Sequence, residues 1–410
     1  MKEIKVLDRY DVMQNEDSLF GYYAWPTVSR LQDGRLVVVA SGFRRAHVCP
    51  FGKTVISFSE DEGKTWSFPT PIIDTPLDDR DGGILVYGDN NVIVNSFNGS
   101  IESQRVWLRW RKYDYDQMPE GPAKEIERLD MEFCHAYLNL LEKCDGVKRD
   151  LDTNGYCGSA LSTHQEKYFG STFRVSHDGA KSFGPIRYSP ITNPHGPFAT
   201  KDGRVLYVGT PIGDYAHPVQ DKRVRLCEIL PDESVVEIGA IPEIFDNEGN
   251  KLAWSEPHAI ELNDGRILVH IRVEKPGVDY GIFTIYQSIS SDGGKTFSNP
   301  KPVPLTKESK EQVDPNFVGA PPFIYRHSSG ALISLLSMRV GEVCLRALIS
   351  YDEGETWELY RLLSIDGQRD VGYPSAIELE DGTLYTTYYA HKDMSSPATI
   401  MAIRWELPKK

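Results

Sequence analysis

The sequence predicts an all-β fold, a six-bladed β-propeller, from two short repeats that run in step along the chain. The first repeat is a turn close to Ser-x-Asp-x-Gly-x-Thr-Trp, which we call the Asp turn. Its four copies are Ser59–Trp66, Ser176–Phe183, Ser290–Phe297 and Ser350–Trp357. In such a turn the Ser and Asp side chains bond backbone amides, Gly adopts the left-handed conformation and the aromatic residue packs beneath. Its recurrence at long intervals indicates one supersecondary unit used several times.

The second repeat is a hairpin, in which a strand, a two-residue turn of the Asp-Gly type and another strand follow one another. Its turns are Asp33-Gly34, Asp202-Gly203, Asp264-Gly265, Ser329-Gly330 and Asp381-Gly382, with a weaker sixth at Gly88-Asp89. Six hairpins, each with a later turn, predict six four-stranded sheets, and a radial arrangement leaves only short, protected edges. The runs 3–10 and 398–407 are expected to share the last blade and close the ring. Residues 1–410 would then form a single propeller.

One segment, residues 101–166, interrupts this rhythm between the second hairpin and the second Asp turn. Within it, residues 122–143 place apolar side chains at spacings of three and four. Pro122 suits a first helical turn and Gly146 suits the end of a helix. We therefore predict an insertion into blade two that contains one amphipathic helix. It would be a surface appendage on the blade edge, a lid over the central mouth or a dimer contact.

Charge and composition limit the possible partners. The formal net charge of −14 argues against nucleic acid, which selects a basic surface. No apolar run has transmembrane length, and the N-terminus lacks the apolar core of a signal peptide. The six cysteines have no metal-binding spacing, so we expect reduced thiols, no metal, no cofactor and a cytoplasmic location.

Propeller geometry brings one set of residues to one mouth of the central channel. The first strand of each blade lines the channel, and its start lies beside the end of the second strand. The first-strand positions carry Trp25, Arg80, Asp81, His195, Glu256, His258 and Tyr373. The second strands end at Arg44, Arg45 and His47, at Arg272, at Arg339 and at His391. Several arginines around one channel require an anion, for which a ligand carboxylate or phosphate is the natural partner. The Asp turns lie at the opposite end and are expected to be structural.

These features resemble the sialidase (neuraminidase) superfamily, particularly its bacterial members with BNR repeats, whose Asp-box turns are similar to the Asp turns. The stretch Glu256–Arg272 is similar to the sialidase segment that carries a catalytic glutamate and, one hairpin later, an arginine of the carboxylate-binding triad. The stretch Gly372–Gly382 resembles the strand with the nucleophilic tyrosine. The resemblance covers nearly the whole chain apart from the insertion.

The resemblance implies a retaining exo-glycosidase that removes terminal acidic sugars, either sialic acid or a related 2-keto acid sugar. Tyr373 would attack the anomeric carbon, and Glu256 would take the phenolic proton. A neutral phenol suits this substrate, because the carboxylate on the anomeric carbon repels an anionic nucleophile. Arg272 and Arg339 would hold that carboxylate. The expected partner is thus an anionic carbohydrate, and the oligomeric state is not predicted.

The first blade departs from the sialidase pattern. Sialidases carry Phe/Tyr-Arg-Ile-Pro there, whereas this chain has Tyr23-Ala24-Trp25-Pro26, so that Ala24 replaces the first arginine of the triad. We expect Arg44 or Arg45 to supply the missing charge. The general acid is expected to be Asp81 or, less favourably, Asp79.

Two alternatives remain open. A lyase acting on a uronate would use Arg272 to neutralise the carboxylate, His195 or His258 as the base and Tyr373 as the acid. A glycan-binding propeller without activity would stack Trp25 and its neighbouring tyrosines on sugar. A metal site is disfavoured because the histidines at the mouth come from separate blades without a ligand motif.

Overall fold

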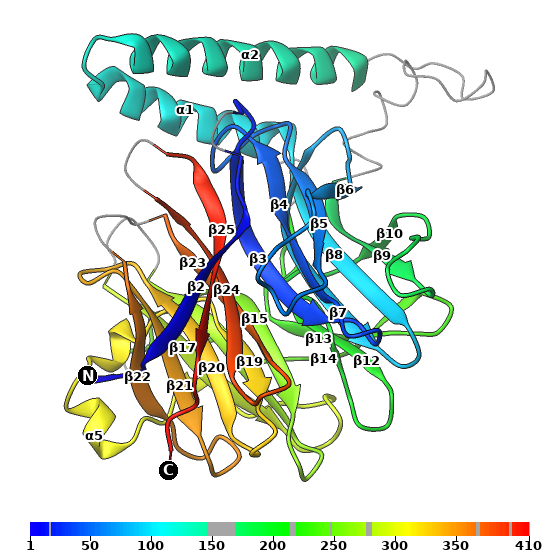
Figure 1. Cartoon of the computed structure of the whole chain (residues 1–410), viewed down its shortest axis with the longest axis vertical. Helices are drawn as coiled ribbons and strands as arrows, with labels where there is room; N and C mark the ends of the chain where they lie inside the picture. The colour runs from blue at the N-terminus through cyan, green and yellow to red at the C-terminus, as the bar shows by residue number, and fades with distance from the viewer. Residues whose placement is uncertain are drawn as a thin grey trace.

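Six antiparallel sheets follow one another around a ring, as the sequence predicted (Figure 1). The structure is a computed structural model that describes residues 1–15, 18–145, 169–213, 219–246, 248–275, 281–365, 370–392 and 396–409. Within each sheet the strands follow the chain from the channel outward, except that two N-terminal strands are added at the outer edges of the last two blades. The first strands of neighbouring blades contact one another all the way around the channel.

The strands of the first three blades have the following bounds. Blade one contains β3 (Tyr22–Arg30), β4 (Leu36–Arg44), β5 (Lys53–Ser59) and β6 (Thr70–Ile73). Blade two contains β7 (Asp78–Tyr87), β8 (Asn91–Gly99), β9 (Gly170–Ser176) and β10 (Arg187–Ser189). Blade three contains β11 (Phe198–Ala199), β12 (Val205–Gly209), β13 (Arg225–Ile229) and β14 (Val235–Ala240).

The other three blades include both ends of the chain. Blade four contains β15 (Ala253–Glu261), β16 (Ile267–Glu274), β17 (Phe283–Ser290) and β18 (Lys301–Pro302), followed by α5 (Lys307–Lys310) and the 3₁₀ turn η1 (Pro315–Phe317). Blade five contains β19 (Phe323–Arg326), β20 (Leu332–Met338), β21 (Cys344–Ser350) and β22 (Glu358–Ser364), with β1 (Lys2–Glu3) parallel to β22. Blade six contains β23 (Gly372–Glu378), β24 (Leu384–His391), β25 (Ala398–Trp405) and β2 (Val6–Met13).

The N-terminal strand closes the ring. β2 pairs antiparallel with β25, from Val6 opposite Trp405 to Met13 opposite Ile400. The first and last strands of the chain therefore share blade six, as expected, and the ladder hydrogen bonds between them hold the ring shut. The short parallel strand β1 was not predicted from the sequence.

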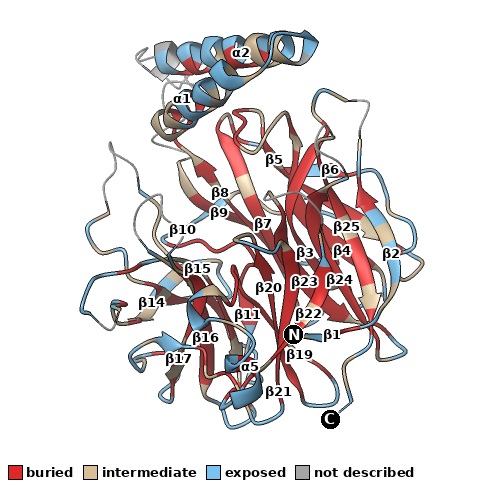
Figure 2. Cartoon of the chain, turned by 90° about the vertical axis from the view of Figure 1, so that its left-hand side faces the viewer, coloured by how far each residue is buried: buried red, intermediate tan, exposed pale blue. Residues whose placement is uncertain are grey.

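The hydrophobic core lies between neighbouring sheets, where the strands are buried on both faces (Figure 2). The Asp turns, between the third and fourth strands, add polar fastenings from one blade to the next. Trp357, at the end of the fourth Asp turn, is fully buried and donates its indole N–H to Gln287 of blade four over 2.9 Å. Gln287 in turn donates to the carbonyl of Gly354 in the same turn over 3.0 Å. The Asp turn thus fixes the position of its blade against the preceding one.

The insertion contains two helices where the sequence predicted one. α1 (Ile101–Gln117) begins directly after β8 with Ser100 as its N-cap, and α2 (Pro122–Asp145) returns beside it above the propeller (Figure 1). The buried side of α1 includes the polar Gln104 between Ile101 and Leu108, which interrupts the apolar stripe from which a helix is identified. Among the described residues, no helix is long and apolar enough to cross a membrane.

We expect Ser290→Ala to lower the stability of the fold. The Ser290 hydroxyl accepts the buried Gly294 N–H over 2.8 Å and donates to Asp292 over 2.9 Å. Its loss leaves a buried amide without a partner, at a cost of about 1–3 kcal/mol. Urea unfolding measures the change as a lower midpoint at an unchanged slope. The matched control is Ser291→Ala, at an exposed neighbouring position. Equal midpoints for the two variants would contradict the assigned role of the Asp turn.

Candidate active site

The first strands of four blades contain the same backbone feature, a β-bulge at a residue with positive φ. Trp25, Asp81, Glu256 and Tyr373 each lie in the first strand of a blade with a positive φ, of 56, 50, 47 and 50° respectively. At each of these points the pairing with the second strand shifts, which marks a β-bulge. A bulge bends the strand and re-aims the side chain. Each strained conformation costs about 1–3 kcal/mol and persists only where the surrounding structure enforces it.

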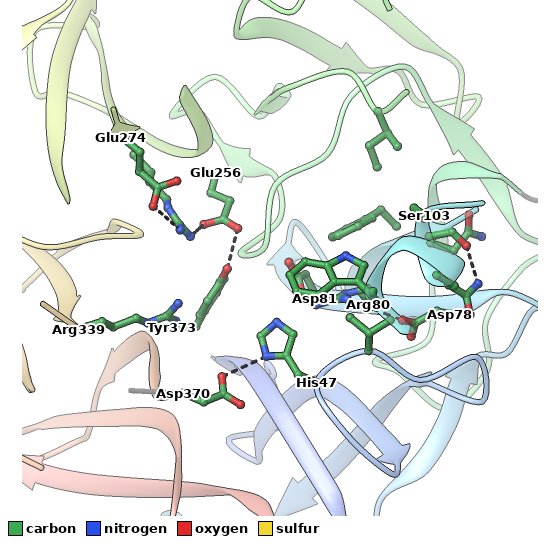
Figure 3. Close-up of a pocket in the computed structure, with 18 of the residues that line it drawn as sticks. His47, Asp78, Arg80, Asp81, Ser103, Glu256, Glu274, Arg339, Asp370 and Tyr373 are labelled. Atoms are coloured by element: carbon green, nitrogen blue, oxygen red, sulfur yellow. Dashed lines mark hydrogen bonds and ion pairs between the residues drawn. The ribbon is translucent and has the colours of Figure 1, made fainter. Parts of the chain in front are cut away.

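Three of these four side chains, those of Asp81, Glu256 and Tyr373, line one cavity of about 970 Å³ (Figure 3). All six blades and helix α1 contribute to its wall, blade three through Ile212 and Gly213 after β12. The other charged or polar lining side chains are His47, Asp78, Arg80, Asn98, Ser103, Gln104, Arg272, Glu274, Arg339 and Asp370. The sequence argument thus assigned the tyrosine, the glutamate and the aspartate to one site, and the structure brings them together there.

A continuous chain of hydrogen bonds links the tyrosine to two carboxylates. The Tyr373 hydroxyl donates to Glu256 Oε1 over 2.6 Å, and Arg272 Nη1 donates to Glu256 Oε2 over 2.6 Å. Arg272 Nη2 donates to Glu274 over 2.8 Å (Figure 3). Both oxygens of Glu256 are therefore held, one of them by the group whose proton it would accept.

The environment keeps the phenol protonated and the glutamate ionised. Burial and the negative charges of Glu256 and Asp81 raise the pKa of Tyr373 well above its usual value. Burial raises the pKa of Glu256, but the charge of Arg272 and the hydrogen bonds from Tyr373 and Arg272 lower it further, to a net decrease. The resting pair is thus a neutral phenol beside an ionised carboxylate.

The pKa of Asp81 is shifted in the opposite direction to that of Glu256. Burial raises the pKa of Asp81 to about 7, and the charge of Glu256 adds to this effect, while Arg80 opposes it. The side chain is 4% exposed, and its Oδ1 has no hydrogen-bond partner in the part of the chain that the structure describes. Asp81 therefore lines the cavity as a carboxylic acid that loses its proton only near neutral pH, far above the usual range of an aspartate.

Two guanidinium groups at the cavity, those of Arg339 and Arg80, are only weakly neutralised by neighbouring carboxylates. Arg339 donates to the carbonyl of Val371 over 2.7 Å and to the Tyr389 hydroxyl over 3.4 Å, and forms no ion pair among the described residues. Arg80 lies over the ring of Trp25 at 4.5 Å and is 3.7 Å from Asp78. These cations provide a place for a negatively charged ligand group.

The expectation that Arg44 or Arg45 replaces the missing blade-one arginine does not fit the structure, because neither lines the cavity. Arg44 is fully buried, bridges to Asp78 over 2.7 Å and donates to the carbonyls of Asp79 and His47. Arg45 pairs with Asp130 of helix α2. The guanidinium group that reaches the cavity from this side is Arg80, which precedes Asp81 on β7.

His195, His258 and Trp25 were also predicted to bind substrate, but none of them lines the cavity. His195 contacts the Thr27 hydroxyl of blade one over 3.2 Å, and burial lowers its pKa to about 3. His258 accepts the Ile324 N–H of blade five over 3.0 Å. These buried, neutral histidines connect blades. His47 does line the cavity, whereas Trp25 lies behind it as a support for Arg80.

Several residues of the cavity were not predicted from the sequence. Glu274 lies two positions after Arg272 on β16, on the same face, so strand periodicity could have identified it. Asp370 lies in the loop before β23, and Trp107 lies on α1, the helix that was not predicted. The insertion therefore supplies part of the cavity wall through Trp107, Ser103 and Gln104, and is more than an appendage on the blade edge. Among the described residues, no group of three metal-ligating side chains has metal-binding geometry.

A model of the BNR repeat-like domain matches residues 158–386, more than half of the chain, so the chain belongs to this family. No curated protein matches it. Among solved structures, a Dyadobacter fermentans protein of unknown function is 18% identical, with a TM-score of 0.69 and complete coverage of both chains. The intramolecular trans-sialidase of Ruminococcus gnavus is 12% identical, with a TM-score of 0.56 and coverage of 98% and 97%. An α-L-arabinofuranosidase of Fusarium graminearum is 11% identical, with a TM-score of 0.56 and coverage of 98% of both chains. At such identities the likeness establishes the propeller fold.

An ionic cluster fastens the insertion to the propeller. Asp130 of α2 is 4% exposed and pairs with Arg45 of blade one and, over 2.6 Å, with Arg111 of α1. The Tyr137 hydroxyl of α2 also donates to the carbonyl of Pro76 over 3.0 Å. These contacts determine where α1, and with it Trp107, stands at the cavity.

Asp130→Ala should therefore loosen the insertion. The substitution leaves two guanidinium groups without their shared carboxylate, a loss on the order of 3 kcal/mol for a buried pair. Limited proteolysis should cut the variant faster than the parent protein between residues 101 and 145, while the propeller stays intact. Glu132→Ala is the control, because Glu132 pairs with Arg128 on the exposed side of the same helix. Equal cleavage of both variants would refute the role of the cluster.

Proposed function

We propose that the protein is a sialidase-like exo-glycosidase that hydrolyses terminal acidic sugars with retention, through Tyr373 as nucleophile. The observation that carries this proposal is the 2.6 Å hydrogen bond from the Tyr373 hydroxyl to Glu256, beside the guanidinium groups of Arg272 and Arg339. A ligand-binding site has no need of a buried phenol paired with an ionised carboxylate. A glycosidase acting on a sugar with a carboxylate at the anomeric carbon requires this pair.

The first half-reaction follows from the resting protonation states. The Tyr373 oxygen attacks the anomeric carbon while Glu256 takes the phenolic proton. The bond from that carbon to the leaving oxygen breaks, and Asp81 supplies the proton that the leaving oxygen needs. The product of this step is a glycosyl group bonded to Tyr373, with Glu256 protonated and Asp81 ionised.

The ligand carboxylate would be bound by Arg339 together with Arg272. The guanidinium carbon of Arg339 lies 5.4 Å from the centre of the Tyr373 ring, so an anion held there is beside the nucleophile. Arg272 is already hydrogen-bonded to Glu256 and Glu274, which leaves Arg339 as the main site for the substrate charge. This arrangement supports an acidic sugar over a neutral one such as the arabinose units of the arabinofuranosidase with the same fold.

The structure also bears on the two alternatives. A uronate lyase was expected to use His195 or His258 as its base, and both are buried outside the cavity lining. A propeller that only binds glycans would have no use for an acid such as Asp81, whose pKa burial raises to about 7. Both observations favour the glycosidase.

The test is turnover of 4-methylumbelliferyl glycosides of sialic acid, Kdn and glucuronic acid. Release from the 2-keto acid sugars is expected, and Tyr373→Phe should lower kcat by roughly three orders of magnitude or more while sugar binding survives. Tyr188→Phe, on the outer strand β10, is the control and should be fully active. Full activity of the Tyr373 variant would rule out the nucleophile. An unsaturated product from uronate polymers would establish the lyase instead.

The pH profile tests Asp81 as the acid. The substrate for this test has a poor leaving group, which needs an acid to depart. Because the acid must be protonated to act, kcat/KM should fall as the pH rises above about 7, the pKa to which burial raises Asp81. Asp81→Asn should remove this alkaline limb and lower activity on poor leaving groups by about 10²- to 10⁴-fold. Asp79→Asn is the control, since burial also raises the pKa of Asp79 to about 7 but its carboxylate is bound to Thr75 outside the cavity lining. Loss of the limb in the Asp79 variant alone would show the assignment to be wrong.

A further inference from the structure

A histidine and an aspartate at the cavity are paired in a way that the mechanism above does not use. The Nδ1 of His47 lies 3.1 Å from Asp370 Oδ1. Both residues line the cavity, and His47 precedes the short segment that leads into β5 (Figure 3).

Asp370 is held by a dense set of donors. The Tyr22 hydroxyl donates to its Oδ2 and the Tyr389 hydroxyl to its Oδ1, both over 2.7 Å. His391 Nε2 is a further contact at 3.4 Å. Burial raises the pKa of Asp370, but the hydrogen bonds from His391, His47 and Tyr22 lower it more, so the carboxylate is ionised at every physiological pH. It is therefore a fixed negative acceptor for His47 Nδ1–H.

The ring of His47 is fixed in one orientation. It stands edge-on to Trp25, with ring centres 4.9 Å apart, and lies 6.1 Å from the ring of Trp107 on α1. Its Nε2 has no partner among the described residues. The edge of the ring away from Asp370 faces the part of the cavity where Glu256 and Asp81 lie (Figure 3). A carboxylate on Nδ1–H with an open Nε2 lone pair is the arrangement that orients a histidine as a base.

We propose that His47 is the general base of the second half-reaction, with Asp370 as the positioning residue that fixes its tautomer. The inference rests on the proposed function and assigns the step that releases the sugar from Tyr373. His47 suits this step better than Asp81 does, because the side chain of His47 is 40% exposed and can contact water, whereas Asp81 is buried.

The step balances in atoms and charge. A water oxygen bonds to the anomeric carbon, and one water proton passes to His47 Nε2. The bond between that carbon and the Tyr373 oxygen breaks, and the tyrosine oxygen takes back the proton that Glu256 accepted in the first half-reaction. His47 then releases its proton to solvent, and solvent returns a proton to Asp81.

The charges around His47 favour the neutral base in the resting state. Burial lowers the pKa of His47 and the charges of Arg80 and Arg44 lower it too, against the raising effect of Asp370, to a net decrease. The other titratable groups that face it are Tyr22, which is 3.3 Å from Nδ1, and His391 across Asp370. A protonated Asp81 and a neutral His47 thus coexist near pH 7, which separates the acid from the base.

The test uses the full chain and a 2-keto acid glycoside with a 4-methylumbelliferyl leaving group. Such a group departs without an acid, so the second half-reaction limits the rate. His47→Ala should lower kcat by about 10²- to 10⁴-fold. Sodium azide should restore release of the fluorophore, because azide attacks the anomeric carbon without a base, and the product should be the glycosyl azide. Tyr373→Phe should gain nothing from azide, since no glycosyl-enzyme forms.

The variant Asp370→Asn tests whether Asp370 positions His47 or has a structural role alone. It should lower kcat less than His47→Ala does and shift the acid limb of the pH profile, because the charge that raises the pKa of His47 is lost. His177→Ala, a 63%-exposed histidine in the second Asp turn, is the control and should behave as the parent protein. If the parent protein turns over the substrate and His47→Ala does so equally well, His47 is not the base, and the glycosidase proposal stands. The same conclusion follows if His47→Ala is slow and azide does not rescue it. No turnover by the parent protein would overturn both.

A measurement on the resting protein gives a second test that needs no substrate. ¹⁵N NMR of histidine-labelled protein should show His47 as the Nδ1–H tautomer at neutral pH, assigned by its absence from His47→Ala. In Asp370→Asn this preference should weaken. The Nε2–H tautomer in the parent protein would contradict the proposed geometry.

Discussion

The left-handed bulge in the first strand of the blades is the constraint on which the site depends. It occurs at a residue with a β-carbon in four blades, and in three of them the next residue is proline. Proline has no N–H to lose from the ladder, so the sequence tolerates the interruption there. The strain is held by contacts between blades, such as the hydrogen bond from the Val28 amide to the Ser375 hydroxyl at 3.0 Å. A closed ring is therefore a precondition of the chemistry, because a single blade could not hold Tyr373 or Glu256 in this conformation.

The electrostatics of the cavity explain why these groups remain reactive. Arg272 stabilises the ionised Glu256, and Glu256 in turn disfavours ionisation of both Tyr373 and Asp81. Arg272 thus favours the ionised form of Glu256, and the charge of Glu256 favours the protonated forms of Tyr373 and Asp81. Arg272 is hydrogen-bonded to both Glu256 and Glu274, whereas Arg339 forms no ion pair among the described residues, so Arg339 is the less neutralised of the two guanidinium groups.

The sequence predicted the ring because its turns are determined locally. An Asp turn and an Asp-Gly hairpin need only a few adjacent residues, and their order along the chain specifies the number of blades. The site residues were predictable where a local motif also determines which way the side chain points, as it does for Glu256 and Tyr373. It was not predictable for Arg44 and Arg45, because their direction depends on carboxylates from Asp78 and Asp130, which lie far away in the sequence. Helix α1 was missed because the buried polar Gln104 interrupts its apolar stripe between Ile101 and Leu108.

The loss of the blade-one arginine is best understood together with Trp25 and Arg80. Ala24 is fully buried, and the neighbouring Trp25 occupies the bulge with one guanidinium carbon, that of Arg80, 4.5 Å from its ring and another, that of Arg44, at 5.1 Å. An aromatic ring stabilises such cations without neutralising them. In this chain the positive charge at this side of the cavity therefore comes from blade two, where Arg80 directly precedes Asp81. In that position it limits how far the pKa of Asp81 rises, so the same residue that supplies charge to the cavity also adjusts the acid.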